Sequence, residues 1–190
     1  MADQSLFEYQ TTKHRVDGLS EAHKESQRCW MPPDHEKFKL NVNAASFAEM
    51  CCTSIRAIVR DHIRRVVFTY CVKILSLFDP LIAVLLAMRK GLVLVSNFGL
   101  QIQMLESDSS NAVSLVNSAT DGLTAMDLIT GDIKSVMSIN EYGTCSFIPR
   151  SRNEAVHKLA KPSSVFTTLM YWLGKLPSCL CDVVAKDLPL

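Results

Sequence analysis

Apolar and polar residues alternate along several short segments of the chain, and this pattern predicts β-strands. In segment 37–45, Phe38, Leu40 and Val42 lie on one face and polar residues on the other, which is the two-residue period of a half-buried strand. Four further segments alternate in the same way or are rich in valine and isoleucine, and they also predict strands: 54–62, 64–74, 100–107 and 143–149.

A period of three to four residues predicts helices elsewhere in the chain. The clearest helix begins at Asp79-Pro80, an N-cap followed by a proline in the first turn, and continues to Asn97. Three shorter segments follow the same pattern: 109–118, 125–138 and 152–161. The order β-β-β-α-β-α-α-β-α indicates an α/β fold in which helices flank a mixed sheet.

The two ends of the chain differ from this central region. Residues 1–35 are polar and contain a Pro-Pro-Asp turn at 32–34, so we interpret them as an N-terminal arm or linker. The predicted domain occupies 36–172, and 173–190 form a C-terminal tail that is unusually apolar. This tail either packs back on the domain or presents a surface to a partner.

Charge and cysteine content narrow the functional classes. With 20 Lys and Arg against 19 Asp and Glu, the formal net charge is +1, so nucleic-acid binding would have to come from a local site. The seven cysteines form no Cys-x-x-Cys pair, so we expect free thiols in a reducing compartment and no zinc site.

Segment 66–88 is apolar enough to suggest a membrane span. It contains Lys73 and Asp79 and is interrupted by Pro80, and neither half reaches the roughly 20 residues that a helical span needs. A buried strand followed by a buried helix explains the pattern better. The N-terminus also lacks the apolar core of a signal peptide. We therefore expect an intracellular protein with no membrane partner.

A cluster of polar residues marks the junction between the strand at 100–107 and the next helix. Ser109 is a good N-cap for that helix, and Asp108 is a candidate metal ligand at the strand end. Glu106 is expected to face solvent or to pair with a nearby lysine. Asn153 and Asp127 are expected to cap later helices.

Five segments in this order resemble one known family. They are "CWMPPDHEKFKLNVNAAS", "IRAIVRDHIRRVVF", "DPLIAVLLAMRKGLVLVSNFGL", "ESDSSNAVSLVNS" and "FIPRSRNEAVHKLAK". Together they resemble the ribonuclease H-like domain of plant proteins related to the terminal domain of non-LTR retrotransposon reverse transcriptases. The resemblance implies a ribonuclease H-like fold with a five-stranded sheet, three strands antiparallel and two parallel.

The resemblance also implies a chemistry, namely two-metal hydrolysis of the RNA strand of an RNA–DNA hybrid with Mg²⁺ held by clustered carboxylates. In this sequence the four ligand positions fall on Asn43, Val84, Asp108 and His157. Asp108 is the one carboxylate left to bind metal, and with a metal bound His157 would act beside it as a catalytic group. The competing interpretation of His157 is an exposed helix histidine near Asp108. The active site is therefore expected to be degraded, with weak Mg²⁺ binding and weak or absent hybrid cleavage.

Arginines stand where the family has glycines near its substrate. Arg56, like Ser54, replaces such a glycine, Arg64 replaces the family's hairpin glycine, and Arg60 lies between the two arginines on the same hairpin. Arg150 and Arg152 flank the expected site. All five are candidate phosphate contacts, and ordinary solvated charge is the competing interpretation.

Three functional hypotheses follow from these observations. The first is a nucleic-acid-binding ribonuclease H-like domain with a degraded active site. The second is an active RNA–DNA hybrid endonuclease that uses Asp108 and His157 with substitute ligands. The third is a non-catalytic interaction scaffold.

Overall fold

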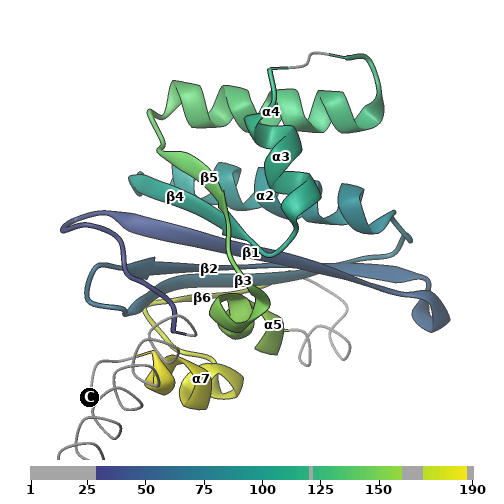
Figure 1. The fold of residues 1–190 in the computed structure, drawn as a ribbon. Helices are drawn as coiled ribbons and strands as arrows, with labels where there is room; N and C mark the ends of the chain where they lie inside the picture. Colours follow the sequence, from purple (N-terminus) through teal and green to yellow (C-terminus); the bar gives the residue numbers. More distant parts are fainter. Residues whose placement is uncertain (1–28, 120–121, 160–168, 188–190) are drawn as a thin grey trace, which may run out of the picture.

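A single mixed sheet organises the computed structural model of the chain, which describes residues 29–119, 122–159 and 169–187 (Figure 1). The six strands of the sheet lie in the order β5-β4-β1-β2-β3-β6. Their bounds are β1 Phe38–Phe47, β2 Cys52–Asp61, β3 Val66–Ile74, β4 Ile102–Ser107, β5 Thr144–Phe147 and β6 Met170–Leu173.

The strand pairing agrees with the predicted α/β fold. β1, β2 and β3 pair antiparallel, and β4 and β5 add to β1 as parallel strands. The prediction of five strands was one too few, because β6 pairs antiparallel with β3 at the far edge. Its four residues, Met-Tyr-Trp-Leu, are continuously apolar and carry no two-residue period from which a strand could be predicted.

Helices cover both faces of the sheet (Figure 1). The long helix α2 and the helices α3 and α4 lie on one face, and α5 and α7 lie on the other. The bounds are α2 Pro80–Asn97, α3 Ser110–Asn117, α4 Ala125–Ile139, α5 Glu154–Lys158 and α7 Cys181–Lys186, with short 3₁₀ turns η1 Ala48–Met50, η2 Arg150–Asn153 and η3 Ser178–Leu180. The predicted helix 152–161 is therefore divided between η2 and α5, and its end lies outside the described residues.

Helix α2 forms because its first turn is capped and one side is apolar. The Asp79 side chain accepts a hydrogen bond from the backbone N–H of Leu81, and Pro80 occupies the first turn, as predicted. The apolar side packs on β1 and β2 and fills the main core. By length and composition α2 could cross a membrane, a property that it shares with the core helices of globular domains, and 44% of it is buried inside the fold.

A second, smaller core lies on the opposite face of the sheet. Residues of α5 and α7 enclose Ile58 of β2 there, together with Leu180 of η3. The described part of the C-terminal tail thus packs back on the domain, the first of the two alternatives. Trp30 is also buried, so the domain extends beyond both predicted boundaries. No disulfide joins the seven cysteines, all of which are described.

Alternation along β1 and β2 gives their two faces different chemistry. Leu40, Val42 and Ile55 belong to the main core beneath α2. Asn43 and Arg56, which are paired across the two strands, lie on the other face, toward α5. The polar residues at the ligand positions are thereby separated from the apolar core.

Candidate functional site

A chain of hydrogen bonds joins three residues that are distant in the sequence. Asn43 lies in β1, Asp108 directly follows the neighbouring parallel strand β4, and His157 lies in α5. His157 Nε2 lies 2.9 Å from Asp108 Oδ2, and Asn43 Nδ2 lies 2.6 Å from His157 Nδ1. The structure thus brings together three of the four positions that the resemblance identified.

The direction of these hydrogen bonds follows from the Asn43 amide. Its Oδ1 accepts from the backbone N–H of Ala44 at 2.7 Å, which places the NH₂ group toward His157. Since the amide donates to Nδ1, that ring nitrogen accepts, and Nε2–H donates to Asp108. The imidazole is thus held between an amide and a carboxylate.

Asn153 holds the second oxygen of the same carboxylate. Its Nδ2 donates to Asp108 Oδ1 at 2.7 Å and to the carbonyl oxygen of Val42 at 3.1 Å. Asn153 occupies the N-cap position of α5, as expected, but its side chain makes no capping bond. The side chain instead ties α5 to the end of β4.

The other two capping predictions are confirmed, because Ser109 caps α3 and Asp127 forms a capping box with Thr124 in α4.

The environment of Asp108 favours its ionised form. Burial acts to raise the pKa of this carboxyl, but the hydrogen bonds from His157 and Asn153 outweigh it and hold the pKa below its usual range. Both oxygens thus serve as hydrogen-bond acceptors within the cluster. The carboxylate is stabilised by neighbouring donors and needs no cation for this.

Acid is expected to weaken this part of the fold through Asp108. Because the folded-state pKa is lowered, its contribution to stability is present above the ordinary value of about 3.9 and is lost as the pH falls through the lower folded-state pKa. Urea unfolding at about pH 5 and pH 3 should show a larger loss of stability in the wild type than in Asp108→Asn. An identical pH dependence in the two proteins would contradict this assignment.

The fourth ligand position, Val84, supplies no oxygen. Val84 lies in α2, is nearly buried and belongs to the main core. The oxygens of Asp108 and the amide oxygen of Asn43 already accept hydrogen bonds. Over the described residues no group of three or more His, Cys, Asp or Glu side chains could hold a metal ion. Because Mg²⁺ prefers several anionic oxygen ligands, these residues do not fit the ion that the resemblance implies.

A buried arginine lies directly behind the cluster. Arg56 is 1% exposed, and one guanidinium nitrogen donates to the carbonyl oxygen of His157 at 3.4 Å. Its Nε has no hydrogen-bond partner among the residues that the structure describes. Burial lowers the pKa of Arg56 to about 10, against the opposing effects of Cys71 and Asp108, so the group stays charged at neutral pH. Its positive charge offsets the negative charge of Asp108.

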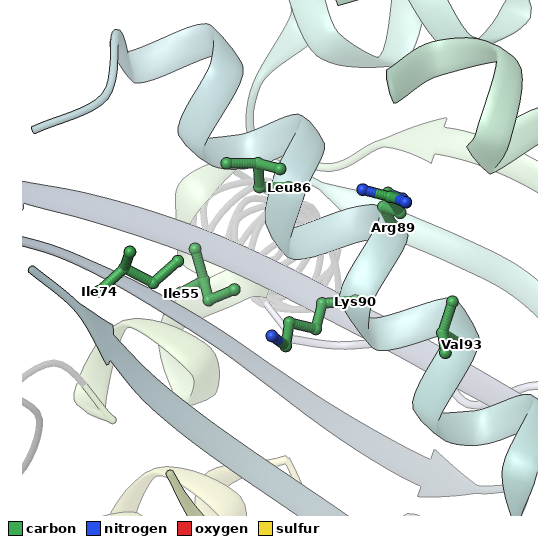
Figure 2. Close-up of a pocket in the computed structure, with 6 residues that line it drawn as sticks. All are labelled: Ile55, Ile74, Leu86, Arg89, Lys90 and Val93. Atoms are coloured by element: carbon green, nitrogen blue, oxygen red, sulfur yellow. The ribbon is translucent and has the colours of Figure 1, made fainter. Parts of the chain in front are cut away.

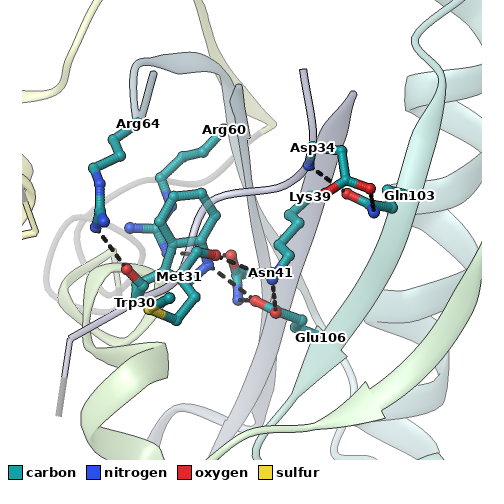
Figure 3. A network of polar contacts seen from close by, with 9 residues as sticks. All are labelled: Trp30, Met31, Asp34, Lys39, Asn41, Arg60, Arg64, Gln103 and Glu106. Atoms are coloured by element: carbon teal, nitrogen blue, oxygen red, sulfur yellow. Dashed lines mark hydrogen bonds and ion pairs between the residues drawn. The ribbon is translucent and has the colours of Figure 1, made fainter. Parts of the chain in front are cut away.

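The neighbouring arginine of β2 is used inside the fold (Figure 3). Arg60 is fully buried, stacks 3.6 Å above the Trp30 ring, and donates to Asp187 at 2.6 Å and to Asn41 at 3.2 Å. Arg64 donates to the carbonyl oxygens of Trp30 and Asp187. Arg56 and Arg60 are therefore buried and do not lie at the surface, where a side chain must be to contact a phosphate.

The backbone of Arg64 has a conformation that is typical of glycine. Its φ of 67° lies in the left-handed region that favours glycine. The two hydrogen bonds from its guanidinium compensate for this backbone conformation.

The remaining candidate phosphate contacts, Arg150 and Arg152, lie in η2. Arg150 is exposed and Arg152 is partly exposed, and both are close to Asn153 in the sequence.

Glu106 lies at the centre of the polar network in Figure 3. It is buried, and it pairs with Lys39 at 2.9 Å, so of the two expectations the lysine pair is confirmed and the solvent-facing position is wrong. Trp30 Nε1 and Asn41 Nδ2 donate to its other oxygen at 2.9 and 2.8 Å. Sequence reasoning missed most of this network because Trp30 lies in the presumed N-terminal arm. Asp187, which Arg60 connects to Asn41, lies in the presumed tail.

A family model described as reverse transcriptase-like matches residues 41–163, which include all four ligand positions. The chain belongs to the reverse transcriptase-like family. Trp30 and Asp187, which are joined by a hydrogen bond from the Trp30 backbone N–H, lie outside the matched residues.

Solved structures with the ribonuclease H fold support the architecture of this reverse transcriptase-like domain. RNase H1 of the archaeon Halobacterium salinarum is 16% identical, with a TM-score of 0.61 over 68% of this chain and 98% of its own. The N-terminal RNase H domain of a Mycobacterium tuberculosis protein is 17% identical, with a TM-score of 0.58 over 67% and 92%. LC11-RNase H1 in complex with an RNA/DNA hybrid is 12% identical, with a TM-score of 0.59 over 67% and 96%. At these identities the likeness shows the fold alone. No curated protein matches the chain.

Proposed function

We propose that this domain binds RNA–DNA hybrid or another nucleic acid without a metal ion and does not cleave it efficiently. The observation that carries the proposal is the closed cluster of Asn43, His157 and Asp108, in which hydrogen bonds take the place of metal ligands. The domain keeps the fold of a hybrid-binding enzyme family and lacks the oxygen ligands that its chemistry needs. We further propose, from the sequence patterns, kinship with retrotransposon-derived plant proteins and an intracellular location.

The charge of the site supports binding that is independent of metal. A site made of several carboxylates repels a phosphodiester until Mg²⁺ neutralises it. Here the single carboxylate, Asp108, is balanced by Arg56, whose charge lies directly behind it. The exposed Arg150 adds a positive charge at the rim. A phosphate group can therefore approach without a bridging cation.

Binding to a fluorescent RNA–DNA hybrid tests this proposal. The dissociation constant is expected to be the same within about twofold in EDTA and in Mg²⁺, and to rise with salt because phosphate contacts release counterions. Arg150→Gln should weaken binding and lower the salt slope by about one. Lys175→Gln, beyond β6 at the other edge of the sheet, is the matched control and should change neither. Binding that disappears in EDTA would contradict the proposal, and no binding even at low salt would favour a non-catalytic scaffold.

An active endonuclease is the second candidate, and the bond between His157 and Asp108 is the observation that favours it. A histidine held against a carboxylate can transfer protons. Cleavage of labelled hybrid in Mg²⁺ or Mn²⁺, abolished by Asp108→Asn, would support this candidate. Our proposal expects no cleavage above background from either protein.

A further inference from the structure

A cavity of about 310 Å³ lies between α2 and the antiparallel strands β2 and β3 (Figure 2). It is on the face of the sheet opposite the cluster of Asn43, His157 and Asp108, because its floor residue Ile55 belongs to the core beneath α2. The residues that line it are Ile55, Ile74, Leu86, Arg89, Lys90 and Val93. The cavity is therefore separate from the proposed nucleic-acid site.

The floor and one wall of the cavity are aliphatic. Ile55 is fully buried at the bottom, Ile74 and Leu86 are partly buried, and Val93 is 41% exposed at the rim. Apolar side chains left open to water in a concave site are typical of binding sites for small apolar molecules. Covering Ile74, Leu86 and Val93 would remove apolar surface from water, which favours binding.

Two cationic residues border the cavity, and they differ in their partners. Arg89 forms an ion pair with Asp132 of α4 at 2.9 Å, and Figure 2 shows it directed away from the strands. Lys90 extends from α2 toward the strands, and within the described part of the chain no hydrogen bond or ion pair engages it. Among the described residues, no carboxylate lines the cavity. Lys90 thus supplies one uncompensated positive charge above an aliphatic floor.

We propose that this cavity binds an amphiphilic anion, namely a straight-chain aliphatic carboxylate. The chain lies over Ile55, Ile74 and Leu86, and the carboxylate accepts a charge-assisted hydrogen bond from Lys90 Nζ. The aliphatic floor and the charge of Lys90 together favour a ligand that has both an apolar chain and a carboxylate. An alcohol of the same length lacks the charge, and a short carboxylate lacks the apolar surface.

Isothermal titration with dodecanoate below its micellar concentration tests the proposal. Saturable binding at one site is expected, and Lys90→Met, which keeps the apolar stem and removes the charge, should weaken it about tenfold or more, as expected for a charged hydrogen bond. Lys175→Met is the matched control and should bind as the wild type does. Dodecanol should bind more weakly and should not distinguish Lys90→Met from the wild type.

Three results would overturn the proposal: no saturable heat, equal binding by Lys90→Met, or equal binding of the alcohol and the acid. Methyl NMR spectra separate site binding from general detergent action. Shifts confined to Ile55, Ile74, Leu86 and Val93 support the cavity, and shifts spread over both cores refute it. Since the cavity is independent of the nucleic-acid site, hybrid binding by Lys90→Met should be unchanged.

Discussion

Glu106→Ala is expected to destabilise the domain by about 3–5 kcal/mol, the range found when one partner of a buried ion pair is removed. Glu106 is 3% exposed and accepts hydrogen bonds from Lys39, Trp30 and Asn41. Without the carboxylate, the buried ammonium of Lys39 keeps only the carbonyl oxygen of Met31 as a partner in this network. Urea unfolding at neutral pH measures the change.

Glu106→Gln separates the charge of this residue from its shape. All three partners are donors, and a carboxylate offers acceptors on both oxygens, whereas an amide must turn its NH₂ group toward one set of donors. We therefore expect Glu106→Gln to cost about 1.5–3 kcal/mol despite its nearly equal volume. Glu154→Gln is the matched control, because the Glu154 side chain is 44% exposed and its Oε1 lies 3.6 Å from Lys158 Nζ. It should cost less than about 1 kcal/mol. A Glu106→Gln protein as stable as this control would show that the network contributes little.

The elements that could be predicted from the sequence are those with a clear period or a local cap. β1 was predicted from alternation, and α2 from Asp79-Pro80 followed by an apolar side. β6 was missed because its strand conformation depends on pairing with β3, about a hundred residues earlier in the chain. Periodicity describes a segment by itself, so it does not report a strand that is defined by a distant partner.

The burial of the arginines could not be predicted for a related reason. Alternation places Arg56, Ile58 and Arg60 on one face of β2, and by charge alone that face would be expected to meet solvent. α5 and α7 cover it, and the partner of Arg60 is Asp187, 127 residues away. The convergence of Asn43, Asp108 and His157 was implied by the family resemblance. The hydrogen bonds that close the cluster could not be predicted from the sequence, because they depend on the orientation of each amide and imidazole.

The double variant Asn43→Asp, Val84→Glu is expected to gain Mg²⁺-dependent cleavage of RNA–DNA hybrid from a wild-type level near zero. The two substitutions restore carboxylates at the positions that the family resemblance assigns to metal ligands, in addition to the existing Asp108. The resemblance implies that these positions converge, and converging carboxylates repel one another unless a cation is present, so the change should create affinity for Mg²⁺. Cleavage of a labelled hybrid, with and without Mg²⁺, measures the gain.

Thermal unfolding gives a second readout that does not depend on activity. Val84 belongs to the main core, so Val84→Glu is expected to destabilise the domain when no metal is present. Ligand binding to the folded state raises its stability, so Mg²⁺ should raise the unfolding temperature of the double variant and leave that of the wild type unchanged.

Each single substitution is a control and should fall short of cleavage, and adding Asp108→Asn to the double variant should abolish its cleavage. If the wild type already cleaves and Asp108→Asn abolishes that activity, the site works with its present residues, and our interpretation of Asn43 and Val84 is wrong. If the double variant folds and binds Mg²⁺ but does not cleave, the loss of activity lies elsewhere, with Arg56 the first residue to restore to glycine, because its buried charge stands directly behind the cluster.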